Sequence, residues 1–198
     1  MNHGIEHAKG EWLLFLNSGD SLYDENTLHF VFSEPHDTEV LYGNYKRIVH
    51  KGQTTIIDGI YDDKLDIDKL THFNICHQAS FYHHSCFDHL RYDETYHICA
   101  DYLLNVTLLN NGKRFLHINQ FICYYDADGI STNSTILLPE LARIYDQIAL
   151  QIIKQGDSNP FFYHELIRRN SCRHILKMAG KLAIFTNRIL KRLEKFTT

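Results

Sequence analysis

A short apolar run that ends in a polar turn constrains the fold of this chain more than any other feature. Residues Trp12–Leu16 have the length and composition of a strand that is buried on both faces. The next residues, Asn17–Asp20, favour a turn, because glycine frees the backbone while Asn, Ser and Asp hydrogen-bond to it locally. Open α/β sheets bind ligands at the carboxyl ends of their strands, so Asp20 is placed to hold a hard divalent cation beside phosphates. A strand followed by an ordinary polar turn is the alternative interpretation.

The composition is that of a globular protein. Hydrophobic residues make up 44% of the 198 positions and aromatic residues 13%, which suits one domain with an appendage. No apolar run approaches the roughly 20 residues of a membrane span, and the polar start is not expected to be a signal peptide. The five cysteines form no Cys-x-x-Cys pair, so we expect buried thiols in a reducing cytosol.

Fourteen histidines invite a metal-site interpretation. His3 and His7 are spaced i, i+4 on an expected helix, but the spacing of the histidines indicates no third ligand. Surface histidines are therefore the preferred interpretation of this pair.

Charge is distributed unevenly along the chain. Residues 164–198 carry nine Lys or Arg and two Glu, a local charge of +7, whereas the preceding residues carry −11. Within this segment, Ile175–Phe196 has apolar residues at spacings of three and four and basic residues between them, which predicts a basic amphipathic helix. Such a helix either packs on its own domain or docks on an anionic membrane surface. Nucleic acid is disfavoured as a partner, because the acidic remainder would repel phosphates.

Hydrophobic patterns and turn signals predict an alternation of helices and strands. The expected helices cover residues 2–9, 24–32, 65–70, 100–110 and 133–155. The expected strands cover residues 12–16, 40–49, 54–60, 75–82 and 115–125. A helix that feeds a buried strand is half of a β-α-β unit, so the chain is expected to begin in the middle of a fold.

Six segments, in this order, carry a resemblance to a known family. They are Asn2-x-Gly4-Ile5-x-x-Ala8-x-Gly10-Glu11-Trp12, Phe15–Asp20, Tyr42–Asn44, His77–Phe81, Ala100–Leu104 and Gly129–Ser131. With them, the chain from Met1 to Ser134 resembles the inverting family 2 glycosyltransferases of the nucleotide-diphosphosugar-binding (GT-A) fold, most of all bacterial enzymes that build surface polysaccharides. The resemblance implies an α/β fold with a mixed, Rossmann-like sheet over residues 1–134. The apolar and basic pattern that follows predicts a helical, basic extension over residues 135–198.

The resemblance also implies a donor site at the turn. Asp20 matches the last Asp of the family's Asp-x-Asp motif, which holds Mg²⁺ or Mn²⁺ against the diphosphate of the donor and stabilises the leaving group. Asn17 and Gly19 match positions where the family often has carboxylates. We therefore expect weaker metal binding, not its loss.

On the acceptor side, Asp101 matches the catalytic base that removes a proton from the acceptor hydroxyl. By itself, Asp101 is an equally good acid for a helix N-terminus, where the helix dipole stabilises it. His77 and Gln78 are expected to hydrogen-bond sugar hydroxyls, with ordinary strand polarity as the alternative.

The implied chemistry is inverting transfer from a nucleotide-sugar, expected to be a UDP-sugar, to a saccharide or lipid-linked acceptor. The expected location is the cytoplasm, with peripheral contact to the inner face of the membrane through Ile175–Phe196. In the family, β-α-β units that carry much of the nucleoside-binding surface precede the first matching segment, so the chain is expected to be N-terminally truncated and to bind donor poorly. The alternative function is a catalytically inactive fragment that acts only in partner or membrane association.

Overall fold

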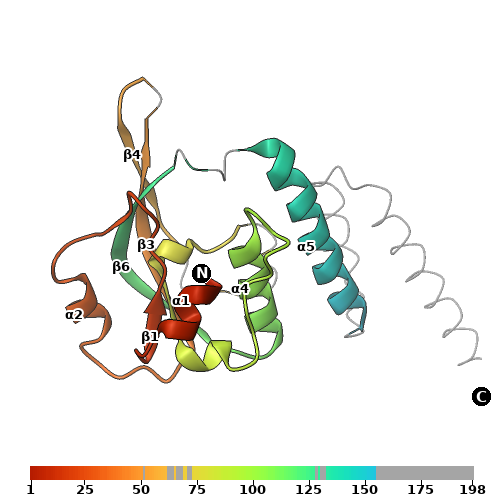
Figure 1. The fold of residues 1–198 in the computed structure, drawn as a ribbon. Coiled ribbons are helices and arrows are strands. Elements are labelled where there is room, and N and C mark those ends of the chain that lie inside the picture. Colours follow the sequence, from red (N-terminus) through yellow and green to blue (C-terminus); the bar gives the residue numbers. More distant parts are fainter. Residues whose placement is uncertain are drawn as a thin grey trace, which may run out of the picture. The chain divides into compact units, whose positions relative to one another are not determined.

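A computed structural model describes residues 1–50, 52–61, 65, 69–70, 73–127, 129 and 133–154. The chain divides into two units, Met1–Leu137 and Leu138–Thr198. The first unit contains a β-sheet with helices on both faces (Figure 1). The second unit contains most of helix α5 (Ser134–Lys154), which matches the helix expected over residues 133–155. The glycosyltransferase domain expected over 1–134 stays a prediction.

The strands of the first unit form one mixed sheet in the order β1-β5-β3-β6-β2, with β4 paired to β3. They are β1 (Trp12–Leu14), β2 (Ser21–Leu22), β3 (Val40–Val49), β4 (Thr55–Gly59), β5 (Ser80–His83) and β6 (Phe115–Asp126). The central pair, β3 and β6, is parallel, and the other pairs are antiparallel. The expected mixed α/β sheet is confirmed.

The helical segments of the first unit are short. They are α1 (Asn2–His7), α2 (Thr27–Val31), α4 (Ala100–Asn110) and the 3₁₀ helices η1 (His77–Ala79) and η2 (His84–Phe87). The helix expected over residues 65–70 lies largely outside the described residues, and the basic helix Ile175–Phe196 lies outside them entirely. No helix in the described part of the chain has the length and apolarity needed to cross a membrane.

Helices α2 and α4 cover opposite faces of the sheet (Figure 1). Along β5, Phe81 packs in a core cluster with Val31 of α2, whereas the hydroxyl of the next residue, Tyr82, donates to Asn105 of α4. Successive side chains of a strand point to opposite faces, so β5 contacts both the α2 layer and the α4 layer. The face with α2 holds this apolar core cluster, whereas the face with α4 contains buried polar groups such as Asn105.

Strand β1 differs from its prediction as a strand buried on both faces. It lies at one end of the described sheet, pairs with β5 and ends at Leu14. Leu13 is buried, but Leu16 is 41% exposed. Leu13 is buried on one face, and Trp12 and Leu14 are partly buried against the core cluster on the other, so the prediction holds only in part and the strand ends before Leu16.

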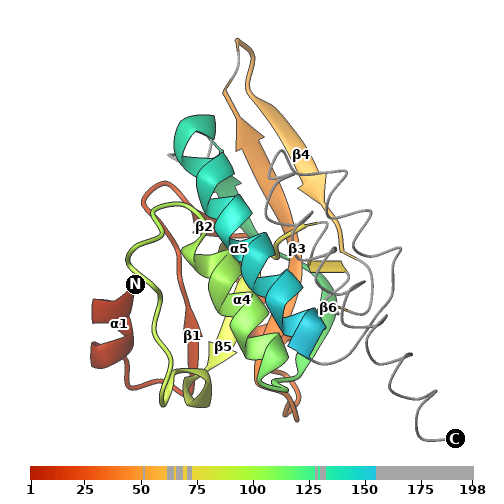
Figure 2. The same cartoon turned by 90° about the vertical axis from the view of Figure 1, so that its right-hand side faces the viewer.

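Strands β3 and β4 form a hairpin that extends from the sheet (Figure 2), as the alternating pattern over residues 54–60 predicted. Where β3 leaves the core, its register with β6 shifts at Gly43 and Asn44. A Cβ atom on Gly43 would lie 2.4 Å from Ile122 Cγ1, so only glycine lets the two strands approach this closely. The buried Asn44 amide donates to Asn119 Oδ1 and accepts the Tyr61 N–H. The Tyr42–Asn44 motif therefore stabilises the sheet.

Candidate active site

A pocket with a volume of about 510 Å³ lies in the first unit, beside the ends of β1 and β6 and the start of α4. Its lining residues are Met1, Asn17, Ser18, Asp20, His77, Gln78, His97, Ile98, Ala100, Asp101, Tyr125, Asp126 and Gly129. Five of the six predicted site residues are among them, and the sixth, Gly19, is not. Gly19 has a φ of +93°, a conformation that favours glycine, so its role is to shape the turn that presents Asp20.

Asp20 is held by backbone groups of two strand ends. Its Oδ2 accepts the N–H of Asn17 at 3.0 Å, and its Oδ1 accepts the N–H of Asp126 at 3.1 Å. The pairing of β2 with β6 follows immediately in the chain and brings the two segments together. The turn after β1 is thus fastened to the carboxyl end of β6 through one carboxylate.

Asp126 is a second carboxylate of the pocket, and it was not among the predicted site residues. Its side chain is 41% exposed, and its Oδ2 lies 3.5 Å from Nε2 of His50. A Cβ atom on Gly19 would lie 3.9 Å from Asp126 Cβ, so Asp126 stands beside the position that often carries a carboxylate in the family. One signal in the sequence could have identified Asp126: it is an acidic residue at the end of a strand, and Asp20 also follows a strand. A polar strand end is common, however, and the pairing of strands cannot be derived from it.

Carboxylate oxygens from Asp20 and Asp126 fit the preference of Mg²⁺ and Mn²⁺ for hard oxygen ligands. Each Asp20 oxygen accepts one N–H, which leaves further acceptor capacity on both oxygens. The donor set of the pocket is therefore chemically suited to the expected cation.

Asp101 lies in the first turn of α4, where the helix dipole favours a negative charge. Its side chain is 17% exposed. Its Oδ2 accepts Asn74 Nδ2–H at 3.0 Å and His77 Nδ1–H at 3.1 Å, and its Oδ1 accepts the N–H of Tyr102 at 2.7 Å. In the described part of the chain, Oδ1 thus has fewer partners than Oδ2.

His77 and Gln78 lie on η1, so the prediction that they belong to a strand was wrong. The N–H of Ala79 and the hydroxyl of Ser80 both donate to the Cys76 carbonyl, and these local bonds replace a strand ladder. Because of this turn, the side chains of His77 and Gln78 point into different surroundings. Gln78 is 7% exposed and accepts the Cys76 thiol, whereas the His77 ring reaches Asp101 on one side and Asn17 on the other.

Thiols and phenols near the pocket stay neutral at physiological pH. Burial, followed by the neighbouring Cys123, raises the pKa of the Cys76 thiol well above its usual value, so Cys76 is a poor nucleophile. Burial also raises the pKa of Tyr82. The titratable groups left for chemistry at this pocket are its carboxylates and histidines.

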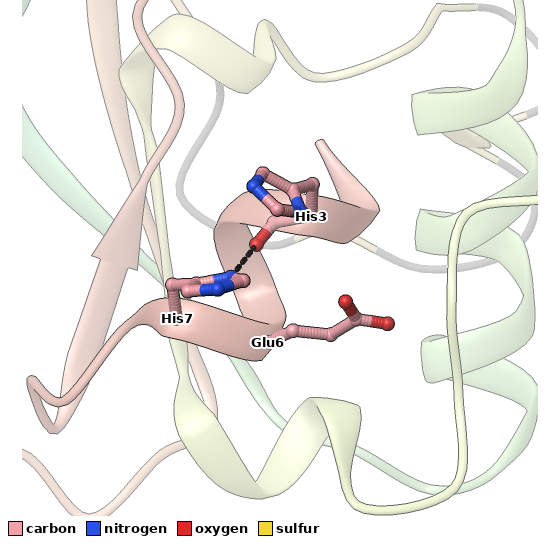
Figure 3. Close-up of side chains that lie close together, drawn as sticks. All are labelled: His3, Glu6 and His7. Carbon is pink, nitrogen blue, oxygen red and sulfur yellow. Dashed lines mark hydrogen bonds between the residues drawn. The ribbon is translucent and has the colours of Figure 1, made fainter.

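The His3 and His7 pair lies elsewhere, on α1 (Figure 3). Glu6 adds a third potential ligand that the spacing of the histidines did not indicate, and the three ligand atoms lie within 4.8 Å of one another. All three residues are exposed and none lines the pocket. This cluster is separate from the candidate active site.

Comparison with known proteins finds glycosyltransferases among the relatives of this chain. Over 144 residues, the chain is 31% identical to a PGL/p-HBAD biosynthesis glycosyltransferase of Mycobacterium bovis, and equally to the protein of that name from Mycobacterium tuberculosis. The chain is homologous to glycosyltransferases. The matches cover 69% of this chain and 53% of each relative, so the chain spans about half the length of the curated relatives it matches. No protein-family model matches the chain.

A solved structure supports the fold. The crystal structure of S. aureus TarS 1–349 has a TM-score of 0.53 with this chain at 16% sequence identity. The likeness covers 83% of this chain and 47% of that one. It is consistent with the GT-A-like architecture that the resemblance implied.

Proposed function

We propose that the pocket is the active site of an inverting family 2 glycosyltransferase, which moves a sugar from a nucleotide-diphosphosugar, a UDP-sugar, to a saccharide or lipid-linked acceptor. The observation that carries this proposal is the arrangement of Asp20 and Asp101. They come from a strand end and a helix start that are far apart in sequence, and they line one pocket. The homology to glycosyltransferases supports the same reaction class.

On the donor side, Asp20 and Asp126 would hold Mg²⁺ or Mn²⁺. When bound, the divalent ion stabilises the negative charge that develops on the leaving diphosphate. The two N–H groups on Asp20 orient its carboxylate in advance, so the carboxylate loses little freedom when a cation binds.

On the acceptor side, Asp101 is the general base. The acceptor hydroxyl donates to Oδ1, because Oδ2 already accepts two side-chain donors. As the hydroxyl oxygen bonds to the anomeric carbon, the bond from that carbon to the diphosphate oxygen breaks, and the hydroxyl proton moves to Asp101. Attack from the side opposite the leaving group inverts the anomeric configuration.

The test is a transfer assay with the whole chain, Mn²⁺, UDP-sugars at millimolar concentration and saccharide or lipid-linked acceptors. Asp101→Asn preserves the shape of the side chain but removes its basicity, so transfer should fall by roughly 10²–10⁴-fold. Asp88→Asn, an exposed position outside the pocket, is the matched control and should retain full activity. Transfer that survives in Asp101→Asn would refute the assignment of the base.

Membrane contact through Ile175–Phe196 is a separate part of the proposal and is supported by the sequence pattern of that segment. Vesicles that contain anionic lipid should sediment the chain, and neutral vesicles should not. Asp101→Asn should sediment as the unsubstituted chain does, since this variant leaves the segment unchanged. No observation on the described residues favours the alternative of a catalytically inactive fragment.

A further inference from the structure

We infer that His77 is a positioning residue that couples the Asp20 turn to the base Asp101, and is not a ligand for sugar hydroxyls. This inference deepens the proposed function and rests on it for the role of Asp101. Its geometric basis is the placement of the imidazole between two predicted site residues. Asn17 Nδ2 lies 3.1 Å from His77 Nε2, and Asp101 Oδ2 lies 3.1 Å from His77 Nδ1.

The two contacts define the tautomer of the ring. The Asn17 Nδ2 group is a donor, so His77 Nε2 must be the unprotonated nitrogen that accepts its hydrogen. The ring proton then resides on Nδ1, where it is donated to Asp101. The imidazole is neutral in this arrangement, and the negative charge stays on the carboxylate that must accept the proton.

A second chain of hydrogen bonds leads from the protein interior to Asp101 Oδ2, the oxygen that also accepts His77 Nδ1–H. The hydroxyl of Tyr82 donates to Asn105 Oδ1, Asn105 Nδ2 donates to Asn74 Oδ1, and Asn74 Nδ2 donates to Asp101 Oδ2. Tyr82 and Asn105 are fully buried, so this line is anchored in the core. Both lines run from donor to acceptor and converge on Oδ2, which fixes the rotation of the carboxylate. Oδ1 accepts one N–H, that of Tyr102, and keeps acceptor capacity for the acceptor hydroxyl.

Asn17 provides the connection to the donor side. Its backbone N–H donates to Asp20, while its side chain donates to His77. A movement of this turn would therefore disturb the ring that orients Asp101. Both ring nitrogens of His77 are already occupied by protein groups, which is why the ring acts by positioning and does not bind a sugar hydroxyl.

The first test reads the tautomer and needs no activity. In ¹⁵N-labelled whole chain, a long-range ¹H–¹⁵N correlation spectrum distinguishes the protonated from the unprotonated ring nitrogen at a pH above the histidine titration range. The signal that disappears in His77→Asn belongs to His77. We expect the Nδ1–H form to predominate, because Asn17 donates to Nε2 and Asp101 accepts from Nδ1. Predominance of the Nε2–H form in the unsubstituted chain would overturn the inference.

The second test uses two matched substitutions in the transfer assay. The amide of Asn can reach the position of Nδ1, so His77→Asn keeps a donor for Asp101, whereas the longer His77→Gln places its amide near Nε2 and loses that donor. We expect kcat to stay within about 10-fold in His77→Asn and to fall about 100-fold in His77→Gln, with smaller changes in donor KM. Equal kcat values in the two variants, or a loss confined to KM, would contradict a positioning role.

The two tests separate this inference from the proposed function. The expected tautomer in a chain that transfers no sugar would refute the proposed activity and leave the hydrogen-bonded bridge established. Transfer by a chain whose His77 is in the Nε2–H form would refute the bridge and leave the proposed activity intact.

Discussion

The two carboxylates of the pocket are held in different ways. Asp20 accepts two backbone N–H groups, which no side-chain substitution at Asn17 or Asp126 removes directly. Asp101 accepts one backbone N–H on Oδ1 but two side-chain donors on Oδ2, and one of these donors, Asn74, is itself held by Asn105. A backbone-held group tolerates changes around it, whereas a side-chain-held group depends on each neighbour. The donor half of the site should therefore be robust and the base half fragile.

The largest expected effect is loss of the backbone-held carboxylate itself. Asp20→Ala removes the cation ligand and leaves two N–H groups without an acceptor, so transfer should fall by about 10³-fold. Binding of Mn²⁺, followed by electron paramagnetic resonance, should weaken in parallel. Asp126→Asn should weaken Mn²⁺ binding by only about 10-fold, because an amide oxygen can still act as a ligand. Unchanged Mn²⁺ affinity in Asp20→Ala would show that the cation does not bind here.

The next effect concerns the side-chain line that holds Asp101. Asn105 is fully buried and makes two hydrogen bonds, so Asn105→Ala removes the acceptor of the Tyr82 hydroxyl and the donor to Asn74 Oδ1. The free energy of unfolding should fall by about 2–4 kcal/mol in urea titrations. Asn17→Ala removes an exposed side chain and should change it by less than about 0.5 kcal/mol. Equal losses of unfolding free energy in Asn105→Ala and Asn17→Ala would contradict the expectation that the base half of the site is more fragile than the donor half.

Removal of the first donor in that line should have a smaller effect. Tyr82→Phe deletes a hydroxyl that donates to Asn105, and the unfolding free energy should fall by about 1 kcal/mol. Transfer should decrease less than in His77→Gln, since Asn74 still donates to Asp101. A larger loss of kcat in Tyr82→Phe than in His77→Gln would show that the Tyr82–Asn105–Asn74 chain, and not His77, orients Asp101.

Alkaline pH offers a graded test of the same line. Burial raises the pKa of Tyr82 in the folded state, so its contribution to stability is present below the unfolded pKa of about 10 and is lost as pH rises toward the folded value. Above about pH 10, this tyrosine should reduce stability with a slope of about 1.4 kcal/mol per pH unit. In Tyr82→Phe that part of the slope should vanish. An identical alkaline slope in both proteins would exclude Tyr82 as its source.

Local patterns predicted the elements that carry the pocket. Strands β3 and β6 and helix α4 were expected nearly at their observed bounds, because apolar periodicity and a stop signal such as Asn110–Gly112 act over a few residues. The predictions that were wrong in whole or in part concern neighbours. The burial of β1 depends on what packs against its two faces, and the 3₁₀ turn at His77 depends on competition between the Cys76 carbonyl and a strand ladder.

By itself, the sequence determined that a turn with a carboxylate follows an apolar strand and that a second carboxylate begins a helix, since composition and turn chemistry are local. Tertiary structure alone decided that Asp126 stands beside Asp20, and that His77 lies between Asn17 and Asp101. Strand order and register bring these groups together across 24 to 106 residues of chain. Such pairings depend on how whole faces of the sheet pack, which no single stretch of residues encodes.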